Sequence, residues 1–198
     1  MELGARFVGA IFAGGPRNLL ARDAARVFAP LPPAVRRVGV FADQDAREIA
    51  AVVAEAGLDV IQLHGAWNAA RVREIRRAVA GSVWPVVRVG RQDVTAEIAA
   101  AFDVGDGIVV DALVPGRLGG TGVPVAWESV AATLESVRAG RMLILAGGLR
   151  SENVAAAIEI LSPDVVDVSS GVESAPGIKD REKMTAFRNA VAGAPTPR

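Results

Sequence analysis

The sequence predicts an α/β protein in which parallel strands alternate with helices. Short apolar runs of five or six residues, such as 37–41 and 106–112, alternate seven times with segments of helical periodicity. Several of these runs are apolar almost throughout, as strands are when helices cover both faces of their sheet. No shift in composition divides the 198 residues, and this length suits one domain spanning residues 1–198.

The expected elements follow one another with short connections. The strands cover residues 7–12, 37–41, 59–64, 84–89, 106–112, 142–148 and a last run that begins at Val165. The helices cover residues 21–29, 46–56, 67–79, about 93–101, 127–138, a segment that starts at Ser151, and about 180–192. This alternation predicts a parallel sheet with helical crossovers.

Helix ends carry recognisable signals. The Pro-rich stretch 30–33 ends the first helix. Asp43 or Asp45 caps the second helix, and Gly57 ends it. Ser151 is expected to cap and start the helix that follows the sixth strand.

Two architectures fit this order, an open doubly wound sheet and a closed (βα)8 barrel of the TIM-barrel type. The evenness of the repeat and the polar or Gly-rich loops after almost every strand favour the barrel. A barrel places its active site on the loops after the strands and often binds phosphate after the last two. Those loops are AGGLRSEN (146–153) and SSGVE (169–173). A complete barrel needs eight strands, and only seven are expected here.

Composition excludes several function classes. The 22 basic and 22 acidic residues balance, so no whole-chain charge favours nucleic acid or a membrane surface. There is no Cys, which excludes disulfides, thiolate metal sites and thiol nucleophiles, and the single His argues against a His-based metal centre or a Ser-His-Asp triad. No apolar stretch approaches 18 residues and no basic leader is present, so a cytoplasmic protein is expected.

Candidate functional residues stand where strands end. Asp111 ends an apolar strand before a Gly-rich loop, and is either an acid–base group or a cap of its own loop. Gly119 and Gly120 in that loop indicate a substrate clamp or an ordinary surface loop. The lone His64 is more typical of a structural residue than of a catalyst. Arg17 either binds a carboxylate or lies at the surface.

Small residues follow the last two strands. Gly147 and Gly148 follow the sixth strand, and Ser170 and Gly171 follow the seventh. Backbone N–H groups in such turns are open to an anion, which predicts a phosphate cradle, with an ordinary strand-to-helix turn as the alternative. Asp43 is more typical of a helix cap than of a catalyst.

Several segments together resemble the phosphoribosylanthranilate isomerase family of tryptophan biosynthesis. The matching segments are GARFVGAIFAGGPR, RVGVF, DVIQLHG, GIVVDALVPGRLGGTG, LILAGGLRSENV and DVSSGVESAPGIKD. They follow the family's order and spacing over nearly the whole chain. The resemblance implies a (βα)8 barrel isomerase that performs an Amadori rearrangement on a small phosphoribosyl substrate. It implies no metal or organic cofactor, and a monomer or homodimer.

The resemblance also implies residue roles. Asp111 corresponds to the general acid that protonates the ribose ring oxygen. Arg17 corresponds to the Arg that holds the anthranilate carboxylate. The family's phosphate loops correspond to the loops that carry Gly147, Gly148, Ser170 and Gly171, and the substrate-binding set further includes His64, Gly119 and Gly120.

The family begins with a strand that reads roughly KICGIT and carries a Cys general base. This chain starts near the end of the first helix of that pattern, at residues 2–5, and contains no Cys. We therefore expect the first strand, most of the first helix and the usual base to be absent. The favoured interpretation is that the 198 residues belong to a longer chain. The alternatives are a genuinely short protein completed by another chain, a non-catalytic barrel that binds phosphoribosyl compounds, or another phosphosugar-converting barrel.

Overall fold

The computed structural model describes residues 3–89, 94–111 and 127–195, which divide into two compact units. The first unit contains residues 1–86 and 103–107, and the second contains residues 87–102 and 108–198. The division passes through strand β4 (Ser82–Arg88) and helix α4 (Thr95–Val104). The single domain expected from composition stays a prediction.

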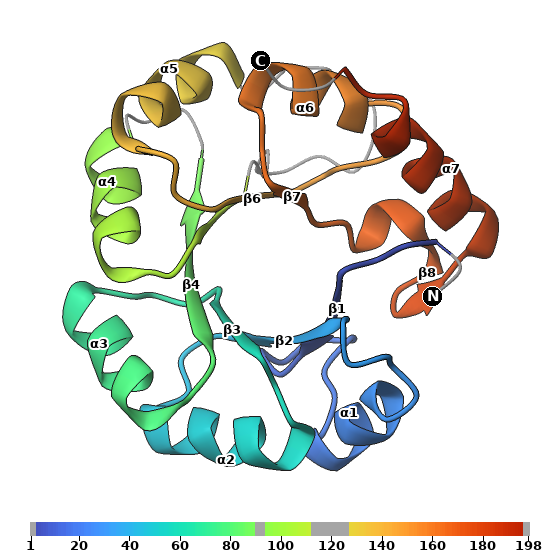
Figure 1. The fold of residues 1–198 in the computed structure, drawn as a ribbon. Helices are drawn as coiled ribbons and strands as arrows, with labels where there is room; N and C mark the ends of the chain where they lie inside the picture. The colour runs from blue at the N-terminus through green and yellow to red at the C-terminus, as the bar shows by residue number, and fades with distance from the viewer. Residues whose placement is uncertain (1–2, 90–93, 112–126, 196–198) are drawn as a thin grey trace. The chain divides into compact units, whose positions relative to one another are not determined.

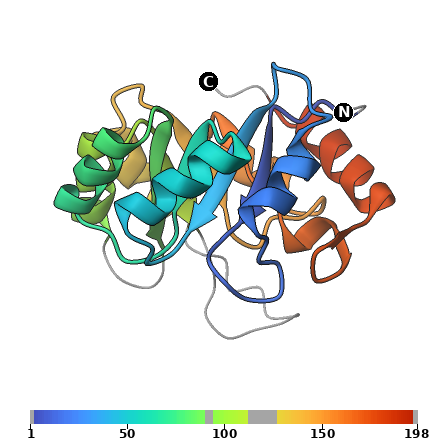
Figure 2. The same cartoon turned by 90° about the horizontal axis from the view of Figure 1, so that it is seen from below.

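The first unit is a parallel sheet with helical crossovers. Its strands are β1 (Phe7–Ile11), β2 (Arg36–Phe41), β3 (Val60–Leu63) and the first part of β4, each paired in parallel with the next. The connecting helices are α1 (Ala21–Phe28), α2 (Ala46–Ala56) and α3 (Ala69–Ala78). These helices lie on one side of the strands (Figure 1), and the turned view shows α1 and α2 crossing in front of them (Figure 2).

The second unit repeats this pattern with shorter strands. Its parallel strands are β5 (Ile108–Asp111), β6 (Leu143–Ala146) and β7 (Val165–Val166). Its helices are α5 (Trp127–Val137), α6 (Val154–Leu161) and α7 (Arg181–Ala192), and α6 lies beside α7 (Figure 1). After β7 come a 3-10 turn, η1 (Ser170–Val172), and a small antiparallel hairpin, β8 (Glu173–Ala175) and β9 (Ile178–Lys179).

Apolar strand residues build the core of each unit. In the first, the rings of Phe12 and Phe41 stack with centroids 5.2 Å apart, and Phe41 is fully buried. In the second, every residue of β5 and β6 is buried, which explains why these strands read as unbroken apolar runs. Each Leu or Ile that is fully buried contributes roughly 1.5–3 kcal/mol of transfer free energy.

Seven strands, β1 to β7, appear in parallel pairs among the described residues, as the sequence predicted. The hairpin of β8 and β9 was not expected, and the last parallel strand is only two residues long. Asp45, and not Asp43, caps α2: its carboxylate accepts from the Glu48 N–H at 2.8 Å, and Glu48 accepts from the Asp45 N–H at 2.8 Å.

The expected helix start at Ser151 is wrong, because α6 begins at Val154. The Arg150 N–H donates to Asn153 Oδ1 at 2.8 Å, and the Ser151 hydroxyl donates to Glu152 Oε1 at 2.8 Å. Such local side-chain hydrogen bonds satisfy polar groups in a turn and compete with the helix.

Candidate functional site

Asp111 is a buried carboxylate at the carboxyl end of β5. It follows three buried aliphatic residues, and its own exposed fraction is 2%. Its carbonyl accepts from the Val89 N–H at 2.9 Å, which fixes the backbone at this level. Its Oδ1 is buried and has no hydrogen-bond partner within the described part of the chain. Because an unpaired buried polar atom is costly, this oxygen is the strongest sign of a functional carboxyl group in the second unit.

The loop after β6 presents two glycines with left-handed backbone. Gly147 has φ 90° and Gly148 has φ 63°, and residues other than glycine rarely adopt such backbone angles. Asn153 fixes this loop from the helix side, because its Nδ2 donates to the Gly148 carbonyl at 3.1 Å. At these two residues no side chain covers the backbone of the turn that follows β6.

The loop after β7 lies directly against the loop after β6. Gly171 packs so closely on the Leu149 carbonyl that a Cβ at this position would overlap the carbonyl oxygen. Ser170 is exposed and starts η1. The structure thus brings together the four residues that the sequence assigned to a phosphate cradle: Gly147, Gly148, Ser170 and Gly171.

Two lysines hold the hairpin in place: Lys179 joins it to the loop after β7, and Lys183 joins it to α7. Lys179 Nζ donates to the Ser169 carbonyl at 3.0 Å and contacts Glu173 Oε1 at 3.0 Å. Lys183 Nζ donates to the Glu173 carbonyl at 2.8 Å. Sequence reasoning did not identify Lys179, because the hairpin that brings it back to Ser169 was not expected.

Asp167 is a second carboxylate at the carboxyl ends of these strands. It directly follows β7, and its N–H donates to the Leu145 carbonyl at 2.8 Å. The side chain reaches solvent, while the surrounding protein removes part of its hydration. This desolvation raises the pKa of Asp167, and the negative charge of Asp111 raises it further, whereas Lys179 lowers it. Sequence reasoning missed Asp167, although it follows an apolar run just as Asp111 does.

Arg17 and His64 follow strands of the first unit. Arg17 is half-buried in the turn after β1, where the Gly14 N–H donates to Asn18 Oδ1 at 2.9 Å. His64 follows β3 directly, and its N–H donates to the Phe41 carbonyl at 2.7 Å. Both therefore lie at carboxyl ends of strands, as predicted. Gly119 and Gly120 lie outside the described residues.

Asp43 is an exposed residue after β2. Its side chain is 82% exposed, and its Oδ1 lies 3.9 Å from Arg71 Nη1. Arg71 also donates to the carbonyls of Ala42 and Gln44 at 2.6 and 2.9 Å, so it braces the loop that carries Asp43. An exposed and weak ion pair of this kind suits a surface loop.

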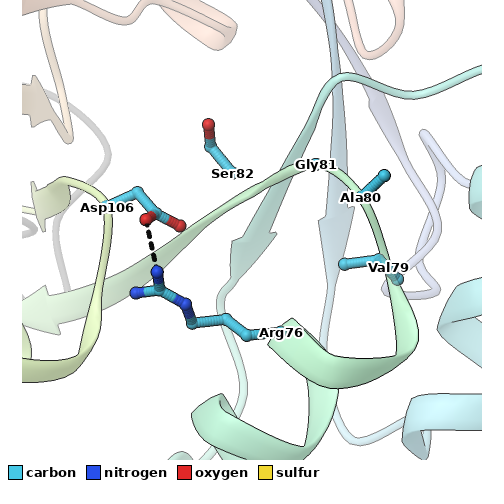
Figure 3. A pocket seen from close by; sticks show the side chains of 6 residues that line it. All are labelled: Arg76, Val79, Ala80, Gly81, Ser82 and Asp106. Carbon is cyan, nitrogen blue, oxygen red and sulfur yellow. Dashed lines mark ion pairs between the residues drawn. The ribbon is translucent and has the colours of Figure 1, made fainter.

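A hollow of about 260 Å³ lies at the opposite, amino-terminal ends of strands in the first unit (Figure 3). It is lined by Arg76, Val79, Ala80, Gly81, Ser82 and Asp106. Arg76 Nη2 lies 2.8 Å from Asp106 Oδ1, and Arg76 Nη1 donates to the Val104 carbonyl at 2.8 Å. Arg76 thereby joins α3 to the segment 104–106, so we assign the residues around this hollow a structural role.

No helix within the described ranges is long and apolar enough to cross a membrane.

Comparison with known proteins identifies a family. The profile described as "N-(5'phosphoribosyl)anthranilate (PRA) isomerase" matches residues 1–190. The N-(5'-phosphoribosyl)anthranilate isomerase of Acidithiobacillus ferrooxidans is 39% identical over 194 residues, which cover 96% of this chain and 88% of that protein.

Solved structures agree with this match. The phosphoribosylanthranilate isomerase of Thermotoga maritima superimposes with a TM-score of 0.85 at 32% identity, covering 97% of this chain and 90% of that one. A further phosphoribosylanthranilate isomerase, in complex with reduced 1-(o-carboxyphenylamino)-1-deoxyribulose 5-phosphate, has a TM-score of 0.83 at 31% identity, with coverage of 97% and 90%. The predicted α/β fold of the TIM-barrel type is thereby confirmed. The expectation that a first strand and helix are missing stays a prediction.

Proposed function

Since the chain belongs to the N-(5'-phosphoribosyl)anthranilate isomerase family, we propose that it converts N-(5'-phosphoribosyl)anthranilate into 1-(2-carboxyphenylamino)-1-deoxyribulose 5-phosphate. The observation that carries this proposal is Asp111, a buried carboxyl group whose Oδ1 lacks a hydrogen-bond partner within the described residues. The corresponding family residue is the general acid, and the unpaired Oδ1 of Asp111 is an atom that a ligand could contact.

In the proposed mechanism, Asp111 gives its proton to the ribose ring oxygen. The bond between that oxygen and C1 breaks, and the nitrogen lone pair forms the C1=N bond of a protonated Schiff base. Loss of the C2 proton gives an enaminol, which gains a proton at C1 and loses its hydroxyl proton to become the ketone. General acid–base groups typically accelerate such steps by about 10²–10⁴-fold.

The loops after β6 and β7 are proposed to hold the substrate phosphate. Gly147 and Gly148 leave the backbone of the first loop uncovered, and Ser170 adds an exposed hydroxyl from the second. Backbone N–H groups and a nearby ammonium attract an anion, and Lys179 is bonded to this second loop. Arg17 and His64 stay predictions from the family resemblance, as do the clamp residues Gly119 and Gly120.

The proposed enzyme acts in the cytoplasm as a monomer or homodimer, and both statements stay predictions from the sequence. The test of the proposed function is the loss of substrate fluorescence on addition of the chain, together with binding of the reduced product analogue. Turnover supports an isomerase. Binding without turnover supports the alternative, a non-catalytic barrel for phosphoribosyl compounds.

A second sample tests separately whether the proposed reaction occurs and whether it needs the Cys general base of the family. The chain preceded by a strand and helix that carry Cys, as in the family pattern, is assayed beside the chain itself. Turnover in either sample supports the proposed reaction. Absence of turnover in both samples, with folded protein, contradicts it.

A further inference from the structure

Arg71 on α3 binds three backbone carbonyl groups from two different loops of the first unit. Its Nη2 donates to the Ala42 carbonyl at 2.6 Å and to the Gln44 carbonyl at 2.9 Å. Its Nη1 donates to the Ala66 carbonyl at 2.9 Å. Ala42 and Gln44 follow β2, whereas Ala66 follows β3. One guanidinium group therefore joins the loops at the carboxyl ends of two neighbouring strands.

The chemistry of arginine suits this arrangement. Its planar guanidinium presents five N–H donors in a fixed fork, whereas a lysine ammonium is a point charge on a flexible stem. Only 22% of the Arg71 side chain is exposed, so its hydrogen bonds are partly shielded from water. The two loops also touch directly, because a Cβ at Gly65 would overlap the Ala42 carbonyl. The loops after β2 and β3 thus form one packed layer.

Gln44 extends this network to the loop after β1. Its Oε1 accepts from the Ala42 N–H at 2.8 Å, and its Nε2 donates to the Phe12 carbonyl at 2.6 Å. Phe12 directly follows β1 and begins the turn that carries Arg17. Three successive loops are therefore tied together through two side chains, those of Arg71 and Gln44.

The same loops carry the residues that are expected to hold the substrate in this unit. Arg17 lies in the turn after β1, and His64 directly follows β3. Residues of a binding site act well only when their own positions are fixed, and a misplacement of about 1 Å can cost about 10²-fold in rate. Arg71 and Gln44 bind the backbone of these loops, so they act on Arg17 and His64 indirectly.

We propose that Arg71 is a positioning residue of the isomerase, which together with Gln44 holds the loops after β1, β2 and β3 so that Arg17 is presented to the carboxylate of the substrate. This inference rests on the proposed function. Without the network, the loops of the free protein adopt more conformations, and only a fraction of the molecules are ready to bind. The apparent affinity falls in proportion to that fraction.

The test compares Arg71→Met with the unsubstituted chain, and Arg73→Met serves as the matched control. Arg73 is exposed on the same helix, so the control removes an equal charge from the surface of α3. Gln44→Glu is a second variant, which keeps an acceptor for the Ala42 N–H but has no N–H to donate to the Phe12 carbonyl. If Arg71→Met does not fold, the same comparison is made on Gln44→Glu.

Two ligands separate a local effect from a general one. The reduced product analogue carries a carboxyphenylamino group and a phosphate, whereas inorganic phosphate has only the group that we assign to the glycine loops of the second unit. Calorimetric titration gives the dissociation constants of both ligands, and the fluorescence assay gives KM and kcat. Thermal unfolding shows the temperatures at which every sample is folded, and all other measurements are made there.

We expect Arg71→Met to raise KM and the dissociation constant of the analogue by about 10–100-fold, while kcat and the dissociation constant of phosphate change by no more than about threefold. Gln44→Glu should raise the same two quantities by a smaller factor, because only the link to the loop after β1 is lost. Arg73→Met should behave as the unsubstituted chain. A purely structural role would lower the melting temperature and leave KM and analogue binding unchanged.

The results that overturn this inference differ from those that overturn the proposed function. A folded Arg71→Met variant with the KM and the analogue affinity of the parent shows that Arg71 does not position the site, and the isomerase assignment stands. Equal weakening of analogue and phosphate binding also overturns the inference, because the effect is then not confined to the loops of the first unit.

Failure of the proposed function has its own signature. If the unsubstituted chain binds the analogue without turning over substrate, the proposed reaction falls, and weaker analogue binding by Arg71→Met still supports the positioning role. If the folded, unsubstituted chain binds no analogue, both proposals fall.

Discussion

The Asp106 carboxylate accepts a hydrogen bond from the Val83 N–H at 2.9 Å, while the Asp106 N–H donates to the Val83 carbonyl at 3.0 Å. This reciprocal pair joins Asp106, two residues before the start of β5, to Val83 near the start of β4, and both residues lie in the first unit. One aspartate therefore satisfies both backbone groups of a residue that begins a strand.

The same reciprocal pair occurs at two further positions. Asp59 accepts from the Arg37 N–H at 2.8 Å and donates to its carbonyl at 2.9 Å. Asp164 accepts from the Leu143 N–H at 2.7 Å and donates to its carbonyl at 2.9 Å. Each pair links the start of one strand to the start of the next. Asp59, before β3, bonds to β2, and Asp164, before β7, bonds to β6.

Near each of these three aspartates, an arginine side chain donates a hydrogen bond to the backbone carbonyl of the residue two positions before the aspartate. The donors and their carbonyl partners are Arg37 with Gly57 at 3.0 Å, Arg76 with Val104 at 2.8 Å, and Arg138 with Ser162 at 2.7 Å. The recurrence indicates that the amino-terminal ends of the strands serve stability, whereas the carboxyl ends carry the proposed chemistry.

Asp106→Ala should lower the free energy of unfolding by about 1–3 kcal/mol, because the Val83 N–H loses a charged acceptor. The accompanying ion pair with Arg76 is partly exposed and adds little. Urea unfolding checks this value, with Glu74→Ala on the exposed face of α3 as the control. Equal stability of the two variants would contradict the reciprocal pairing.

Asp45→Ala should destabilise the protein by about 1 kcal/mol, because it removes the side-chain acceptor of the capping box at the start of α2. Asp43→Ala should change stability far less, since the Asp43 side chain is 82% exposed. Thermal unfolding of the two variants provides the comparison. A larger loss for Asp43→Ala would show that the cap is assigned to the wrong residue.

Gly171→Ala should weaken binding of the phosphorylated product analogue and lower stability by about 1–3 kcal/mol, because its Cβ would overlap the Leu149 carbonyl. Gly148→Ala should lower the free energy of unfolding by only about 1 kcal/mol. A Cβ there would contact no atom, and the cost comes only from the left-handed backbone with φ 63°. Calorimetric titration and urea unfolding measure both effects. A harmless Gly171→Ala would show that the two loops do not pack closely.

Asp167→Asn should change the dependence of stability on pH. The pKa of Asp167 is raised in the folded protein from its ordinary value of 3.8, so the folded state holds the proton more tightly than the unfolded state. This contribution to stability is complete below pH 3.8 and is lost as pH rises through the folded pKa. Asparagine does not ionise, so the variant should gain stability relative to the parent over that interval. Urea unfolding at a series of pH values would show no such gain if the Asp167 carboxyl were fully hydrated.

Sequence periodicity predicted the strands and helices well where burial is strong. Residues 37–41 and 46–56 appear as β2 and α2 with nearly the same bounds, because an apolar run and a capping box are local signals. The predicted start at Ser151 failed for the opposite reason: the hydrogen bonds of Asn153 and Ser151 hold a turn that the pattern of apolar residues does not reveal.

The site was predictable in part. Asp111 and the glycines of the two loops follow apolar runs, so their position at strand ends could be inferred from the sequence. The relation of Asp167 to Asp111 could not, because it depends on the register of three strands. Likewise, the return of Lys179 to Ser169 depends on a hairpin of two very short strands.

The proposed isomerase activity is tested by the rate at which the chain consumes N-(5'-phosphoribosyl)anthranilate, measured for the unsubstituted chain and for Asp111→Asn. Asparagine keeps the shape of the side chain but has no carboxyl proton to give. We expect turnover by the unsubstituted chain and a loss of about 10²–10⁴-fold in kcat for Asp111→Asn, with binding of the reduced product analogue retained. An Asp111→Asn variant that turns over substrate at the rate of the parent would contradict it.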